Sequence, residues 1–160
     1  MGRVVSVSEV LLTEHFEDNP PAGWTVKEEH YPPYDYDFTI SNHVGVSGNG
    51  LLAVSTKSSI GAYWLYKVLD VATGDCVLTP SFYFRREDAV YRANVLSLYL
   101  WDGDVEPTLW NGNLDDAFYT SSPETDKQNG NTWPDRWAFL CEHKSVNLTS
   151  GKLTVAFRFA

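Results

Sequence analysis

Cysteine, methionine and basic residues are scarce in this chain of 160 residues. It has two cysteines and one methionine, and 12 Lys and Arg residues stand against 21 Asp and Glu, for a formal net charge of −9. Two cysteines are too few for a disulfide scaffold. Cys76 and Cys141 are therefore expected either as one bond between adjoining strands or as two buried free thiols. The acidic balance argues against nucleic acid as a partner.

Long apolar runs and catalytic motifs are absent as well. No stretch is long enough to span a membrane as an apolar helix, and the opening MGRVVSVSEVLL does not read as a signal peptide. There is no Gly-x-Ser-x-Gly elbow, no phosphate-binding loop and no His-Glu-x-x-His, and the four histidines are scattered singly. We therefore expect a binding protein and not an enzyme.

Aromatic residues, by contrast, are abundant. Phe, Trp and Tyr make up 14% of the chain, and eleven glycines and eight prolines punctuate short segments in which apolar and polar residues alternate. The expected strands lie within residues 3–12, 24–29, 51–56, 62–71, 76–86, 94–103, 136–148 and 152–160, with a short helical turn at 114–121. Strands at roughly ten-residue spacing predict one domain over residues 1–160, an all-β antiparallel β-sandwich of jelly-roll type.

Several stretches together resemble a known class of domain. They are LLTEHFEDNPPAGWTV, HVGVSGNGLLAVS, LDVATGDCVLTPSFYFR and DRWAFLCEHKSVNLTSGKLTVAFRF. The set is similar to the carbohydrate-binding modules of galactose-binding-like jelly-roll fold, and also to adhesin and MAM-type modules. The resemblance implies a jelly roll, an extracellular or virion-associated setting and recognition of carbohydrate.

The same resemblance implies a structural calcium ion. Glu17 and Asp18 match the place near the end of the first strand where such modules hold a cation, and the turn around Asn49 would bring backbone carbonyls beside them. Calcium takes about six to eight oxygen ligands. The acidic ligand that these modules supply from a further strand is missing, because the sequence ends at Ala160. The alternative is that Glu17 and Asp18 cap a solvated turn.

Aromatic residues in the expected loops are the candidate ligand contacts, since a flat ring can stack on a sugar while polar neighbours bond its hydroxyls. The segment HYPPYDYDF holds three of these rings on a backbone that its prolines stiffen. The candidate residues are Tyr31, Tyr34, Tyr36, Trp101, Asp102, Trp110, Asn111, Trp133 and Arg136. Rings within expected strands are assigned to the core: Trp24, Trp64, Phe82, Phe84, Trp137, Phe139, Phe157 and Phe159.

Two other functions remain open. One is assembly, as in a virus or phage decoration or tail protein, because a sheet edge without its last strand would be filled either by residues 2–10 or by another subunit in a homo-oligomer. The other is a jelly-roll polysaccharide lyase or hydrolase that uses Tyr83, Arg85 and Tyr99 on one sheet face. The partner is accordingly a carbohydrate or another protein subunit.

Overall fold

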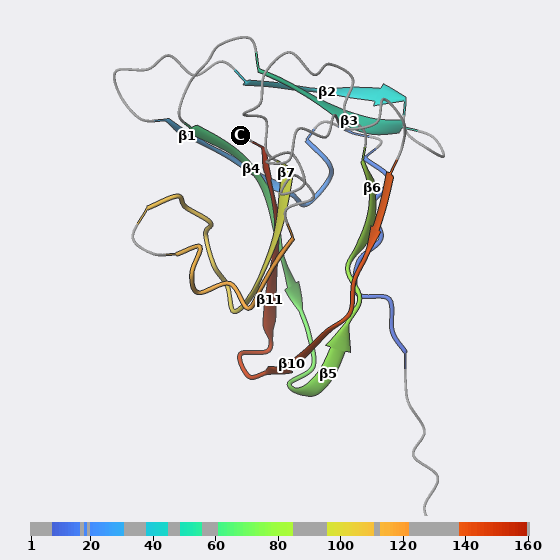
Figure 1. Cartoon of the computed structure of the whole chain (residues 1–160), viewed down its shortest axis with the longest axis vertical. Coiled ribbons are helices and arrows are strands. Elements are labelled where there is room, and N and C mark those ends of the chain that lie inside the picture. The colour runs from blue at the N-terminus through green and yellow to red at the C-terminus, as the bar shows by residue number, and fades with distance from the viewer. Residues whose placement is uncertain are drawn as a thin grey trace, which may run out of the picture.

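Every regular element that the structure describes is a β-strand (Figure 1). The computed structural model describes residues 8–16, 18, 20–30, 38–44, 49–55, 61–84, 96–110, 113–121 and 138–159. Within these ranges there is no helix, and so none that could cross a membrane. All strand pairs are antiparallel. The predicted all-β antiparallel sandwich is confirmed, while the jelly-roll order of its strands stays a prediction.

The larger layer is a five-stranded sheet with the order β1-β4-β11-β7-β8. Its strands are β1 (Thr25–His30), β4 (Gly61–Asp70), β7 (Leu96–Asp102), β8 (Tyr119–Ser121) and β11 (Lys152–Phe159). Four successive residues of β11, from Leu153 to Ala156, are all buried, as are those of β7 from Ser97 to Trp101. Such continuous burial means that both faces of the sheet are covered, which explains why these strands are mostly apolar apart from the buried Ser97 and Thr154.

The facing layer is a two-stranded ribbon that is interrupted halfway (Figure 1). β5 (Gly74–Leu78) pairs with β10 (Lys144–Leu148), and β6 (Ser81–Phe84) pairs with β9 (Ala138–Cys141). The sequence predicted one long strand on each side. Each is split instead, on one side at Thr79 and Pro80, whose ring removes a backbone donor. On the other side the split falls at Glu142 and His143, and Glu142 N donates to Pro80 O at 3.2 Å.

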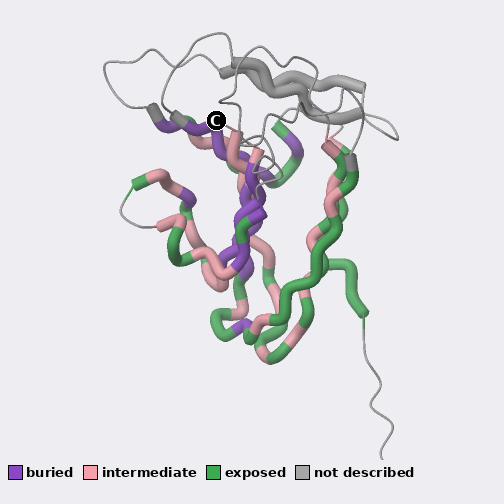
Figure 2. Tube along the Cα trace, viewed as in Figure 1, coloured by how far each residue is buried: buried purple, intermediate pink, exposed green. Residues whose placement is uncertain are grey.

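The main core lies between these two layers (Figure 2). Leu65, Leu98, Leu100, Leu153 and Val155 of the sheet are buried together with Trp24 and Leu148, and Cys76, Leu78, Phe82 and Val146 pack on them from the ribbon. Complete burial of one such apolar side chain contributes about 1.5–3 kcal/mol to folding. The Trp24 assignment to the core is confirmed.

A second core covers the opposite face of the five-stranded sheet. Its buried members are Ala62, Trp64, Tyr99, Trp101 and Ala156. They are covered by the connection that leaves β7, through Val105, Leu109, Leu114 and Ala117. The described parts of this connection, residues 105–110 and 113–117, therefore cover this face of the sheet.

The structure corrects four expectations. Residues 113–116 form a turn and Tyr119–Ser121 form β8, so no helical turn occupies 114–121. Residues 8–12 are not in a strand, so the described part of the N-terminus does not complete a sheet. Phe139 is 54% exposed and is not a core residue. Cys76 and Cys141 are free thiols, partly buried and exposed respectively, and neither is fully buried.

A third pair of strands includes one that the sequence analysis did not expect, at residues 38–44. β2 (Phe38–Val44) pairs with β3 (Asn49–Ser55), with Val44 opposite Asn49. Asn49 and Gly50 belong to the strand and not to the turn, because both extend the ladder toward Val44 and His43.

Candidate functional site

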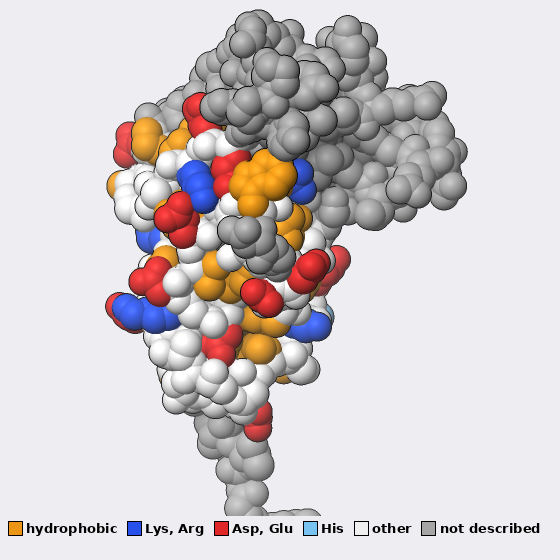
Figure 3. Space-filling view, turned by 90° about the vertical axis from the view of Figure 1, so that its left-hand side faces the viewer, with side chains coloured by type: hydrophobic (Ala, Val, Ile, Leu, Met, Phe, Trp, Pro, Cys, Tyr) orange, Lys and Arg blue, Asp and Glu red, His pale blue; other side chains and the backbone are white. Residues whose placement is uncertain are grey.

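Trp110 is the one predicted ligand ring that the structure describes as exposed, with 42% of its surface accessible. It lies in the connection after β7, which appears at the left of Figure 1 in yellow. Figure 3 shows that side of the molecule, where apolar side chains are interspersed with acidic and basic ones. Tyr31, Tyr34, Tyr36, Asn111, Trp133 and Arg136 lie outside the described residues.

A buried carboxylate anchors the Trp110 loop to the sheet. Glu29 on β1 is only 8% exposed. Its carboxylate accepts hydrogen bonds from Trp64 Nε1 and Leu109 N, both at 2.8 Å, and from Thr108 Oγ1. Burial alone would raise the pKa of Glu29, yet these donors hold it below the usual range. The loop is thus tied to β1 and β4 one residue before Trp110.

Lys27 completes this cluster from the same face of β1. Its ammonium lies 3.3 Å from Glu29 Oε1 and 2.8 Å from Glu106 Oε1, and it donates to Pro107 O at 2.8 Å. Burial tends to lower the pKa of Lys27, but its bonds to Glu106 and Glu29 raise it above the usual value. The cation therefore stays charged and fixes the backbone on the N-terminal side of Thr108.

Asn113 fixes the other side of the loop. Its Oδ1 accepts from Thr108 N at 3.0 Å, and its carbonyl oxygen accepts from Trp101 Nε1 at 2.9 Å. Trp101, which the sequence proposed as a ligand contact, is 1% exposed and stacks on Tyr99 at a centroid distance of 5.4 Å. In this structure its ring supports the loop from below and presents no face to solvent.

Asp102, another predicted ligand contact, is engaged in a turn. Its Oδ2 accepts from Thr149 N and Oγ1 at 2.9 and 2.6 Å, and its Oδ1 accepts from Ser150 N and Oγ at 3.1 and 2.8 Å. The hydroxyl of Thr149, then that of Ser150, and their backbone N–H groups hold the pKa of Asp102 far below its usual range. This carboxylate fastens the β10–β11 turn to the end of β7.

The residues implied for calcium are not brought together by the described part of the chain. Glu17 lies outside it, Asp18 is exposed beside a shallow hollow lined by Thr13, Glu14 and His15, and Asn49 begins β3. Among described residues there is no group of three or more His, Cys, Asp or Glu side chains able to hold a metal. Glu14 instead accepts from Phe16 N at 3.0 Å and Trp24 Nε1 at 2.9 Å.

The residues named for the lyase alternative also lie apart. Tyr83 is exposed on the ribbon, whereas Tyr99 is buried in the second core beyond the five-stranded sheet. Arg85 lies outside the described residues. The two tyrosines therefore do not share one open sheet face.

The sequence analysis did not single out Glu29, whose only signal was its place on the same strand face as Lys27 and opposite a Trp-bearing strand. Phe139 was assigned to the core because it lies in an apolar strand. Its outward direction is shown only by the folded structure, in which it is 54% exposed opposite Tyr83. Comparison with protein-family models, curated proteins and solved structures finds no match for this chain.

Proposed function

We propose that this protein is a non-catalytic binding module that recognises carbohydrate, with Trp110 as an aromatic platform for a sugar ring. The observation that supports it is the anchoring of the loop that carries this exposed indole. Glu29, Lys27 and Asn113 fix the loop backbone around Thr108, so the backbone that leads to the ring is held in place before a ligand arrives.

Rigidity matters because weak ligands cannot offset a large ordering cost. Immobilising a flexible side chain and its loop on binding costs about 0.5–1.5 kcal/mol per side chain. A tryptophan has only two side-chain torsions, and here its backbone is already fixed. The indole combines a broad apolar face with an N–H donor, which suits the apolar face and the hydroxyls of a pyranose.

The test is a glycan array followed by titration monitored by tryptophan fluorescence. Trp110→Ala is expected to weaken binding of a glycan hit by on the order of tenfold, as for a central aromatic contact. Trp110→Tyr keeps a ring and is expected to retain most of the affinity. Equal binding by wild type and Trp110→Ala would contradict the assignment of this ring.

A second candidate function, assembly through a sheet edge, has one observation in its favour. Among the described residues, β5, β6, β9 and β10 each pair with a single neighbour, so the ribbon leaves two unpaired edges. The net charge of −9 opposes association of identical chains, which places this function second. Light scattering tests it, because an assembly protein is expected to exceed the mass of one chain at micromolar concentration.

A further inference from the structure

The outward side of the ribbon carries an ordered row of exposed side chains. We call these eight residues the outer ribbon face: Asp75, Val77, Ser81, Tyr83, Phe139, Cys141, Ser145 and Asn147. All are exposed, and they form four directly opposed cross-strand pairs. Within the four strands, the intervening residues Cys76, Phe82 and Val146 pack against the main core. Between the two strand pairs, Thr79 and His143 are also exposed, with Thr79 Oγ1 3.0 Å from His143 Nδ1. The face therefore runs along both halves of the ribbon across this polar break.

One end of the strip is aromatic. Tyr83 and Phe139 lie opposite each other, with ring centroids 4.6 Å apart and an interplanar angle of 33°. They are 55% and 54% exposed. Two large rings held together in solvent form an apolar platform, and such exposed patches mark interaction sites. The tyrosine hydroxyl adds a donor and acceptor at the edge of this platform.

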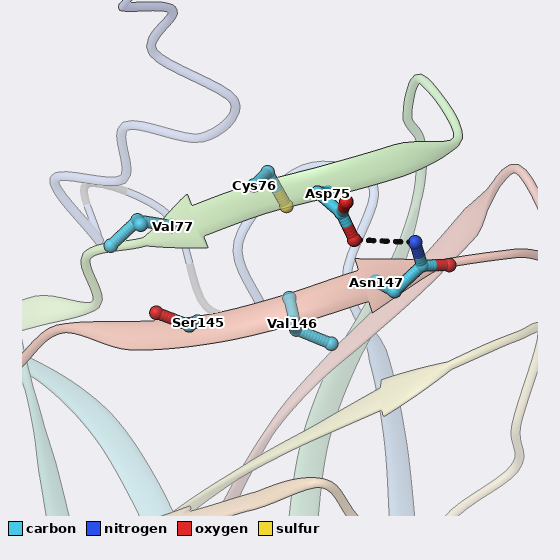
Figure 4. Close-up of a pocket in the computed structure, with 6 residues that line it drawn as sticks. All are labelled: Asp75, Cys76, Val77, Ser145, Val146 and Asn147. Atoms are coloured by element: carbon cyan, nitrogen blue, oxygen red, sulfur yellow. Dashed lines mark hydrogen bonds between the residues drawn. The ribbon is translucent and has the colours of Figure 1, made fainter.

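The other end is polar and hollowed. A shallow hollow of about 500 Å³ is lined by Asp75, Cys76, Val77, Ser145, Val146 and Asn147 (Figure 4). Four of its six lining residues belong to the outer ribbon face, and Cys76 and Val146 lie between them on the same two strands. Asn147 Nδ2 donates to Asp75 Oδ1 at 2.6 Å across the strands. This pair offers a fixed carboxylate and amide, the groups that bond vicinal hydroxyls.

The shape of the strip indicates an elongated ligand. An open surface contacts only one side of a bound molecule, so affinity has to accumulate from repeated contacts along it. From Phe139 on β9 to Asn147 on β10 the chain advances eight residues, which is at most roughly 26 Å at the usual strand rise. A polymer lying parallel to the strands would meet the aromatic pair and the polar pair at the same time.

The charge of the strip indicates an uncharged ligand. Among its eight residues only Asp75 carries a fixed charge, and it is already hydrogen-bonded to Asn147. The exposed Glu142 and Lys144 lie between Cys141 and Ser145, but Glu142 accepts a hydrogen bond from Tyr119, and Lys144 lies opposite Leu78, which packs on the main core. An anionic polymer would be repelled by the net charge of −9. A second acidic copy of this chain would meet the same repulsion. A neutral chain rich in hydroxyl groups meets none.

We propose that the outer ribbon face binds a linear, uncharged polysaccharide that lies along β5–β6 and β9–β10. This inference rests on the proposed carbohydrate-binding function and places an extended subsite on the layer opposite the Trp110 loop. Tyr83 and Phe139 stack on the chain, and Asp75, Ser145 and Asn147 bond its hydroxyls.

The test is affinity electrophoresis of the full chain in gels that contain hydroxyethyl cellulose, xylan or galactomannan, with alginate as a charged comparison. Wild type is expected to be retarded by at least one neutral polymer and not by alginate. Tyr83→Ala and Phe139→Ala are each expected to weaken that retardation by about tenfold in dissociation constant. Tyr83→Phe, which keeps the ring, and Val10→Ala, an exposed site elsewhere, serve as controls.

Three other outcomes would each contradict binding on the outer ribbon face, and they also show whether the proposed carbohydrate-binding function still holds. If neutral polymers bind but only Trp110→Ala weakens their binding, the ribbon is not the binding site and the proposed function stands. If array glycans bind through Trp110 while no polymer is retarded, the extended subsite is wrong and the proposed function again stands. If no glycan binds and Tyr83→Ala dissolves a dimer seen by light scattering, the face is a protein interface and both are wrong.

Discussion

Trp64 Nε1 donates a 2.8 Å hydrogen bond to the carboxylate of Glu29, and both side chains are buried beneath the connection that leaves β7. The bond joins β1 to β4, while the same carboxylate holds the loop through Leu109 N. One acidic side chain thus couples the integrity of the second core to the position of Trp110. Replacing it is expected to affect stability and ligand binding together.

Glu29→Gln tests this coupling. The amide can accept through only one oxygen and presents an N–H group to donors that need an acceptor. We expect the free energy of unfolding to fall by about 1–3 kcal/mol, the cost of leaving buried donors unsatisfied. Denaturant titration measures it, and Glu28→Gln, on the exposed neighbour, is the matched control. Equal losses in both variants would show that the buried network does not matter.

Acid is expected to weaken the β10–β11 turn through Asp102. Its pKa is lowered on folding, so its stabilisation is complete above the unfolded pKa of about 4 and is lost as pH falls below it. Wild type should therefore exceed Asp102→Asn in stability at neutral pH and approach it near pH 2–3. Asp104→Asn removes the same charge two residues away. A gap between wild type and Asp102→Asn that does not change with pH would contradict the assignment.

Because the pKa of Tyr119 is raised on folding, this residue should make the protein less stable in alkali. Burial and a 2.7 Å hydrogen bond that its hydroxyl donates to Glu142 raise the pKa of Tyr119 to about 12. A pKa raised on folding stabilises below the unfolded value of about 10 and loses this effect as pH rises toward 12. Tyr119→Phe should reduce that alkaline loss in denaturant titrations, leaving the smaller part due to Tyr63 and Tyr66, whose pKa values burial also raises. Tyr83→Phe should retain the full loss. If Tyr119→Phe follows wild type throughout, the bond to Glu142 is unimportant in solution.

Gly151 is expected to be sensitive for a backbone reason. It ends the β10–β11 turn with a φ of 74°, where a Cβ finds space, since its nearest neighbour would be Val71 O at 3.9 Å. Gly151→Ala should thus lower the free energy of unfolding by about 1–2 kcal/mol through left-handed strain alone, and the melting temperature should fall with it. Gly151→Asn should cost less, because asparagine tolerates this region better. An alanine variant as stable as wild type would indicate that the turn changes conformation.

The local pattern of apolar and turn residues in the sequence was sufficient to locate most strands. It did not show where strands are interrupted or which side chains point to solvent. Mostly apolar stretches bounded by turn residues marked β4, β7 and β11, and burial on both faces of the sheet explains why β7 and β11 are so apolar. The prediction was wrong for the ribbon, where two expected long strands are each split. The splits fall at Pro80 and at Glu142–His143, and only the pairing of these two segments in the structure shows where they lie. Trp101 and Trp110 carry similar polar neighbours in the sequence. Their separation into buried support and exposed platform depends on the fold of the loop over the sheet.

The aromatic row of the second core has an optical consequence. Tyr99 and Trp101 are stacked with an interplanar angle of 15°, and Trp64 meets Tyr99 edge-on at 5.6 Å. The electronic transitions of rings held this close and at fixed angles couple to one another. These three residues should therefore contribute strongly to the near-ultraviolet circular dichroism of the chain. Because the connection after β7 covers these rings, their circular dichroism signal should change when that connection leaves the sheet, and no added label is needed to detect it.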